Sequence, residues 1–277
     1  MQVTWSIFPK FQRQLDPRGL AGLIREVGLD TTNLVVRDGY WVTPANLERD
    51  TARFVREMAG QGVEIRFATT SYTARQLIDD PTPLKVFANH GIRAFRIGYF
   101  DYKPPQDVRA AMGEANELLR RLAGLCEQHA VRAIYQLHHN TLVASPSAAA
   151  VLLEGVPPAA VGLELDPGNQ THEGHENYQR TVDLLRPHIA WAVCKDSILV
   201  QDKSRLDAPD KGWRRRWAPA QEGVVRWDHF FAALASIDFN GVLKLMPFYD
   251  ENDPAAQRAT LGREVAYLKR TLMGVSR

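Results

Sequence analysis

The chain alternates between short apolar runs rich in β-branched residues and longer segments in which apolar residues recur with helical spacing. The short runs predict strands over residues 3–8, 32–37, 63–69, 92–100, 131–138, 161–165, 189–194 and 242–248. The periodic segments predict helices over residues 17–27, 44–60, 72–89, 105–129, 145–155, 175–185, 225–237 and 254–273. Pro81 and Pro83 are expected to divide the third helix, because proline interrupts the helical hydrogen-bond ladder.

Eight consecutive strand–helix units predict an α/β fold, a single (β/α)8 TIM barrel that occupies residues 1–277 as one domain. A doubly wound open sheet is the alternative, and it usually carries a glycine-rich turn after its first strand. Residues 8–12 read FPKFQ and contain no glycine, which favours the barrel. Residues 197–223 are predicted to form a long polar loop.

Composition narrows the classes of partner. The chain has 34 Lys and Arg against 32 Asp and Glu, which gives a formal net charge of +2. This balance predicts no nucleic-acid or membrane partner, and it agrees with a small, largely uncharged substrate. No apolar run approaches the roughly 18 residues of a membrane span, and the first residues lack a signal-peptide pattern. With only two cysteines, a disulfide framework is excluded. We therefore expect a cytoplasmic protein.

Reactive side chains follow three neighbouring predicted strands, and a parallel barrel places its site at these carboxyl ends. Strand alternation puts Gln136 and His138 on one side, so His138 is a candidate general base, or else a hydrogen-bonded rim histidine. Asp166 is a candidate to orient that base, bind a hydroxyl or hold a metal, or it caps the next turn. Lys195 is a candidate acid or base, or an ion-pair partner of Asp166 or Asp196.

Further polar and aromatic residues near the strand ends are candidates to bind substrate, by hydrogen bonding or by stacking on a sugar ring: Gln136, His139, Asn169, Arg37, Trp5 and Phe248. The aromatic residues among them could equally pack in the barrel core near its mouth and bind no substrate. His172–Glu176 has the composition of a metal cluster, but acidic residues at a helix start favour the helix dipole, and we expect no metal there. The run Arg214–Arg216 is either a solvated face or a source of one arginine that closes over the substrate.

The segments YQLHHNTLVASP, VGLELDPGN, VCKDS, EGVVRWDHFFAAL and GVLKLMPF resemble the xylose-isomerase-like barrel superfamily, which holds sugar epimerases, ketose isomerases, inosose dehydratases and apurinic endonucleases. The resemblance implies four metal ligands, a Glu, an Asp, a His and a Glu on consecutive strands, with the two glutamates exchanging substrate protons. At these positions the chain has Gln136, Asp166, Val193 and Met246. It also implies the glutamate–glycine turn found at Glu222 and Gly223.

Asp166 is thus the only family metal ligand that survives, and the divalent ion typical of the family (Mn²⁺, Mg²⁺ or Zn²⁺) is left open. We expect a sugar isomerase- or epimerase-like enzyme that abstracts a proton next to a carbonyl of a small sugar, keto-sugar or polyol, with His138 or Lys195 as the acting group. The alternatives are a lyase or dehydratase using the same pocket, and a non-catalytic sugar-binding protein. A nuclease ranks last. Residues 197–223 are a candidate homodimer contact.

Overall fold

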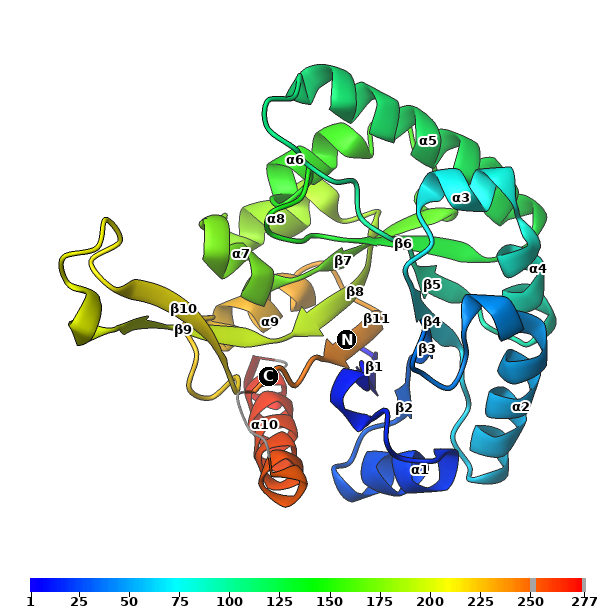
Figure 1. The fold of residues 1–277 in the computed structure, drawn as a ribbon, viewed down its shortest axis with the longest axis horizontal. Coiled ribbons are helices and arrows are strands. Elements are labelled where there is room, and N and C mark those ends of the chain that lie inside the picture. The colour runs from blue at the N-terminus through cyan, green and yellow to red at the C-terminus, as the bar shows by residue number, and fades with distance from the viewer. Residues whose placement is uncertain (250–252, 276–277) are drawn as a thin grey trace.

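The computed structural model describes residues 1–249 and 253–275. Its central sheet consists of parallel strands β1 Val3–Ile7, β2 Thr31–Thr32, β3 Leu34–Val36, β4 Phe67–Thr70, β5 Ala94–Arg96, β6 Arg132–Gln136, β7 Val161–Leu165, β8 Ile189–Cys194 and β11 Gly241–Leu245. The strand order is β2-β1-β11-β8-β7-β6-β5-β4-β3. Only Asn33 separates β2 from β3, so the two ends of the sheet are one interrupted strand and the barrel is nearly closed (Figure 1). The predicted (β/α)8 fold is confirmed.

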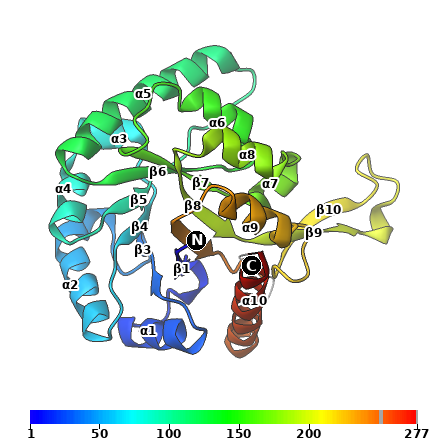
Figure 2. The ribbon, with the colours of Figure 1, turned by 180° about the vertical axis from the view of Figure 1, so that it is seen from behind.

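Helices surround the barrel on its outside (Figures 1 and 2). They are α1 Pro17–Glu26, α2 Leu47–Gly60, α3 Ala74–Asp79, α4 Thr82–Asn89, α5 Val108–Gln128, α6 Pro146–Leu152, α7 Pro167–Glu173, α8 Tyr178–Leu185, α9 Trp227–Ala235 and α10 Pro254–Val275. The predicted break at Pro81 and Pro83 separates α3 from α4. Within the described residues, no helix is long and apolar enough to cross a membrane.

Two elements differ from the sequence prediction. The predicted loop over residues 197–223 contains an antiparallel hairpin, β9 Asp196–Gln201 and β10 Trp213–Ala218, which projects from the barrel (Figures 1 and 2). Strand β10 places Arg214–Arg216 between two tryptophans, and the short apolar run Ile198–Val200 of β9 is partly exposed, so the hairpin lacks the apolar alternation of a half-buried strand. Helix α7 was also missed. Asp166 caps it by accepting a hydrogen bond from the Asn169 amide at 2.8 Å.

Charged residues lie in the middle of the barrel, on strands that are otherwise apolar. Glu164 of β7 and Lys244 of β11 form an ion pair with 2.5 Å between Oε1 and Nζ, and both side chains are fully buried. The Lys244 ammonium also lies 5.0 Å from the centre of the Trp191 ring. The paired charges therefore compensate one another inside the barrel, where an isolated charge is costly.

Asp196 ties the hairpin to the start of α9. Its Oδ1 accepts hydrogen bonds from the amides of Ser197 at 2.7 Å, Val224 at 3.0 Å and Val225 at 3.1 Å. Its Oδ2 accepts one from Trp227 Nε1 at 2.8 Å. The carboxylate thus organises the turn that contains Gly223 and orients the base of the hairpin.

Gly223→Ala is expected to destabilise the protein strongly. A Cβ at this position would lie 1.9 Å from Asp196 Cγ, so either the turn or the Asp196 hydrogen bonds must shift. We expect a loss of about 3 kcal/mol in the free energy of unfolding, measured by chemical denaturation. Gly124→Ala is the matched control, because nothing lies within 4 Å of its added Cβ in the exposed face of α5. Equal stability of the two variants would contradict this role of Gly223.

Candidate active site

A cavity of about 320 Å³ opens at the carboxyl ends of the barrel strands. Its walls combine cations, imidazoles, an amide and aromatic rings: Phe8, Lys10, Arg37, Arg96, Tyr99, Gln136, His138, His139, Lys195, Trp217, Met246 and Phe248. Six residues predicted from the sequence line it directly, namely Arg37, Gln136, His138, His139, Lys195 and Phe248. Asp166 and Asn169 lie immediately behind the wall and bond to residues that line it.

Asp166 is the buried centre of the polar network. Its Oδ2 accepts a hydrogen bond from Gln136 Nε2 at 2.7 Å and forms an ion pair with Lys195 Nζ at 3.0 Å. Its Oδ1 accepts a hydrogen bond from the Asn169 amide at the start of α7. The residue therefore caps a helix, one of the roles considered for it, and it also pairs with Lys195, the alternative considered for that lysine.

Lys195 presents a buried ammonium group to the cavity. Besides Asp166, its Nζ donates to Asn169 Oδ1 at 2.6 Å, and it lies 4.4 Å from the centre of the Trp217 ring. Burial lowers the pKa of Lys195, while the Asp166 carboxylate opposes that shift. Two of the three ammonium protons have protein acceptors, so one remains for an oxygen of a bound molecule.

His138 presents an imidazole to the same cavity. Its Nδ1 lies 2.7 Å from the His139 carbonyl oxygen, and this contact assigns the proton to Nδ1 and the free lone pair to Nε2. The Tyr99 ring packs against the imidazole, with 4.5 Å between ring centres. Burial lowers the pKa of His138 to about 4, so the ring is neutral at pH 7. A neutral imidazole with a free nitrogen can accept a proton.

A row of stacked rings continues from His138 toward the hairpin. His139 stacks on His138 with 4.5 Å between centres and on His172 with 4.2 Å, and His172 packs against Trp217 at 4.7 Å. His139 Nδ1 is bonded to Asn169 Oδ1 at 3.1 Å. This stack builds one wall of the cavity.

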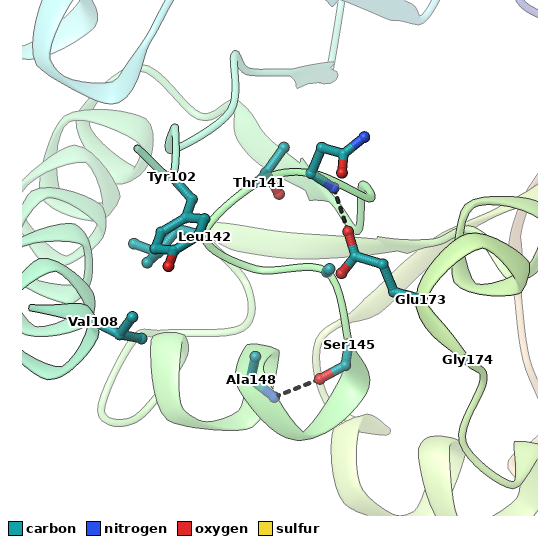
Figure 3. Close-up of a pocket in the computed structure, with 10 residues that line it drawn as sticks. Tyr102, Val108, Thr141, Leu142, Ser145, Ala148, Glu173 and Gly174 are labelled. Carbon is teal, nitrogen blue, oxygen red and sulfur yellow. Dashed lines mark hydrogen bonds between the residues drawn. The ribbon is translucent and has the colours of Figure 1, made fainter. Parts of the chain in front are cut away.

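The acidic residues near His172 serve the surrounding loops. Glu173 accepts a hydrogen bond from the Asn140 amide and borders a second cavity of about 420 Å³ (Figure 3). Glu176 accepts one from the Ser147 amide at 2.9 Å, and His175 stacks on Tyr178. The segment that resembles a metal cluster in the sequence thus distributes its side chains over different contacts. Glu173 fixes the turn that follows His138 and His139.

The four positions at which the family carries metal ligands converge in space. Gln136 Nε2 contacts both Asp166 and Met246 Sδ, the latter at 3.9 Å, and Val193 packs with Met246 in one apolar cluster. These positions supply one carboxylate, one amide, one thioether and one alkyl group, and Lys195 already pairs with the carboxylate. The described residues contain no group of three or more His, Cys, Asp or Glu placed to hold a metal ion. The site does not fit a hard divalent cation.

Trp5 does not join the other predicted binding residues. Its backbone amide donates to Asp30 Oδ2 at 2.7 Å, its side chain belongs to the apolar core, and Lys269 Nζ lies 5.7 Å from the ring centre. The neighbouring Ser6 is buried and bonds to Asn33 across to the interrupted strand. The arginine run of the hairpin is also elsewhere, since none of Arg214–Arg216 lines the cavity and Arg214 lies 3.9 Å from Asp202.

Lys10, Arg96 and Trp217 are among the residues of the cavity wall that were not predicted from the sequence. Lys10 lies in the turn after the first strand, and Trp217 lies in the hairpin predicted to be a loop. Arg96 is an arginine inside an apolar strand and is 2% exposed. A charged residue in such a strand was the available signal, because it needs a partner or a ligand once buried.

A polar cavity at the carboxyl ends of eight parallel strands defines the class to which the molecule belongs, the α/β barrels that carry their site at this rim. The family model of the xylose isomerase-like TIM barrel matches residues 85–271, and the chain belongs to this family. Among curated proteins, none matches the sequence.

Solved structures share the whole fold. A D-psicose 3-epimerase structure determined with D-fructose matches with a TM-score of 0.73 and 11% identity, covering 98% of this chain and 99% of that one. An L-ribulose 3-epimerase matches with a TM-score of 0.72 and 14% identity, covering 100% and 96%. A probable 3-DHS dehydratase from Bacillus anthracis matches with a TM-score of 0.68 and 18% identity, covering 96% and 99%. At such identities the likeness concerns the fold.

Proposed function

We propose that this protein is a sugar isomerase- or epimerase-like enzyme that transfers a proton next to a carbonyl of a small sugar, keto-sugar or polyol-derived ketone. One observation carries the proposal: a single cavity presents both a neutral imidazole, His138, and a buried ammonium, Lys195, that is held by the one retained family ligand. The epimerases of the same fold support a reaction of this class. In this proposal the ammonium takes the role that a metal cation has in the family.

Each step uses residues of this chain. His138 Nε2 removes a proton from the carbon next to the substrate carbonyl, and the C–H electron pair moves onto the carbonyl oxygen. The free N–H of Lys195 hydrogen-bonds to that oxygen as its negative charge develops. Asp166 and Asn169 hold the ammonium in place. In isomerisation, the hydroxyl on the carbon that lost its proton passes its O–H proton to the former carbonyl oxygen, and the proton on His138 Nε2 adds to the former carbonyl carbon. In epimerisation, a proton from water adds to the opposite face of the carbon that lost its proton, and His138 releases its proton to water.

The test is a screen of neutral ketoses and aldoses in deuterated water, followed by proton NMR. We expect deuterium at the carbon next to the carbonyl, together with an isomer or epimer of the added sugar. An unsaturated or dehydrated product would instead assign the lyase alternative, because the same intermediate can expel a neighbouring hydroxyl. Binding of sugars without exchange would contradict the proposal and favour a non-catalytic sugar-binding protein.

The rate should form a plateau around neutral pH. His138 acts while it is neutral, so its contribution falls as the pH drops through its pKa of about 4. Lys195 acts while it is charged, so its contribution falls as the pH rises through a pKa lowered from 10.5 by burial. The measurement is kcat/KM between pH 3.5 and 10, with circular dichroism as the control for folding. An acid limb near the ordinary imidazole pKa of about 6.5 would contradict a buried base.

A further inference from the structure

Three cations of the cavity wall have no anionic partner. Lys10, Arg37 and Arg96 all line the cavity, and no carboxylate of residues 1–249 or 253–275 forms an ion pair with any of them. The two other buried lysines of this region differ in that respect, since Lys195 pairs with Asp166 and Lys244 with Glu164. The three unpaired cations therefore give the cavity a local positive excess that the net charge of +2 does not reveal.

Arg96 shows this excess most clearly, because its side chain is 2% exposed. Its Nη2 donates to the Thr70 carbonyl at 2.9 Å, whereas Nε and Nη1 are buried and have no hydrogen-bond partner. The guanidinium carbon lies 4.8 Å from the centre of the Tyr99 ring. A buried guanidinium with two unsatisfied donors is costly, and an acceptor that arrives with a ligand would remove that cost.

Arg37 and Lys10 extend the same charged wall. Arg37 Nε is buried without a hydrogen-bond partner, and the guanidinium carbon lies 5.6 Å from the centre of the Phe8 ring. Lys10 Nζ lies 4.5 Å from the centre of the Phe248 ring. Burial, and then the charge of Arg96, lower the pKa of Arg37, while burial and Arg37 lower that of Lys10. Arg37 therefore lies between the other two cations in this wall and within electrostatic reach of each.

The charged wall and the reactive groups come from different strands of the barrel. Lys10 follows β1, Arg37 follows β3 and Arg96 ends β5, whereas His138 follows β6 and Lys195 follows β8. In the strand order these sets occupy different arcs of the barrel, and the Tyr99 ring lies between Arg96 and His138. A molecule that spans the cavity can therefore place its carbonyl at Lys195 and a second polar group at the arginines.

We infer that the substrate carries an anionic oxygen group, a carboxylate or a phosphate, which binds Lys10, Arg37 and Arg96 while its carbonyl faces His138 and Lys195. The inference rests on the proposed function and specifies its substrate class as a sugar acid or a sugar phosphate. Arginine is suited to both groups, since its fork of donors matches two oxygens of either one. The cavity volume of about 320 Å³ admits a small molecule of this kind.

Matched ligands test the charge requirement directly. D-glucose, D-glucuronate and D-glucose 6-phosphate differ only at carbon six, and calorimetry at low ionic strength measures the Kd of each. We expect both anionic sugars to bind on the order of 10- to 100-fold more tightly than D-glucose, because charge-assisted hydrogen bonds replace unsatisfied donors. The tighter of the two identifies the carboxylate or the phosphate. Equal affinity for all three sugars would overturn the inference.

Variants locate the binding group. Arg37→Gln and Lys10→Gln should each weaken binding of the tighter anionic sugar by about tenfold, and by clearly more than they weaken binding of D-glucose. Arg96→Gln should have the same or a larger effect, and thermal unfolding checks that this variant folds. Arg93→Gln is the matched control, because Arg93 is exposed at the opposite end of β5. Anion binding that survives both Arg37→Gln and Lys10→Gln would overturn the assignment.

Deuterium exchange separates this inference from the proposed function. Exchange into neutral sugars, with no preference for the anionic ones, would retain the proton-transfer proposal and overturn the anion site. Selective binding of the anionic sugars without exchange into any of them would retain the anion site and overturn the proton-transfer proposal. Exchange that is faster with the anionic sugar, and slowed by Arg37→Gln mainly through KM, supports both.

Discussion

Lys195→Met is expected to reduce the rate of carbonyl-directed proton exchange by about 10³-fold, in the range found when a preorganised donor to a developing oxyanion is removed. The substitution keeps an unbranched side chain but removes the ammonium that donates to Asn169 and pairs with Asp166. It should also lower the free energy of unfolding by about 3–5 kcal/mol, because the Asp166 carboxylate then stays buried without its cation. The exchange rate is measured by deuterium incorporation in quenched samples, and the free energy of unfolding is measured by chemical denaturation.

A double variant separates catalysis from stability. Asp166→Asn combined with Lys195→Met removes both buried charges and should recover most of the lost stability, while the exchange rate stays low. Recovery of the rate together with the stability would contradict a direct role of the ammonium. An exchange rate within tenfold of the parent protein in the single variant would contradict it as well.

His138→Asn should reduce the exchange rate by about 10²–10⁴-fold, the usual contribution of a positioned general base. The asparagine amide can still donate to the His139 carbonyl, as His138 Nδ1 does, but it supplies no basic nitrogen at the position of Nε2. Binding of the sugar should change much less than the rate, and calorimetry beside kinetics measures this difference.

His229→Gln is the matched control for this substitution, because His229 is exposed on α9 and lies outside the cavity. It should leave the exchange rate unchanged. If His138→Asn costs less than tenfold in rate, the base must be another group. Lys195, the other group considered for this role in the sequence, is then the candidate to test with its own pH profile.

The barrel could be predicted from the sequence because its strands and helices carry different hydrophobic periods. Boundaries agree closely where a strand is buried along its whole length, as in β7 and β8, whose bounds match the prediction. The hairpin β9–β10 could not be predicted in this way, since its strands mix apolar and charged residues without a regular period and most of their side chains are partly exposed. Helix α7 was missed because glycine, asparagine and threonine favour turns, and only the Asp166 cap and burial against the barrel hold them in a helix.

The site could be predicted in part. The carboxyl ends of parallel strands meet at one rim, so His138, Asp166 and Lys195 could be placed together from the sequence alone. Trp5 shows the limit of alternation in a short apolar strand, where either face is compatible with the core. Trp217 reaches the cavity from the hairpin through its contact with His172, and this contact has no local signal in the chain. Arg96 had a local signal, a charged residue inside an apolar strand, but the pattern does not show that it lines the cavity.

The family resemblance identified the metal-ligand positions, and the structure shows what now surrounds them. Gln136 and Met246 still meet Asp166 at one point, but their side chains supply no anionic ligand. Lys195 instead brings a cation that belongs to the chain itself. The fold is therefore retained, and in the proposed function Lys195 rather than a metal ion supplies the positive charge at the reacting carbonyl.

The most direct test of whether Lys195 acts in place of a metal ion is the incorporation of solvent deuterium into sugars by chelator-treated protein. Ketoses and their acid and phosphate derivatives are incubated in deuterated water with chelator-treated protein, and again after addition of Mn²⁺. We predict exchange at the carbon next to the carbonyl at the same rate in both samples, and its loss in Lys195→Met. Exchange that appears only after Mn²⁺ is added, or no exchange with any of these sugars, would contradict the proposed role of Lys195.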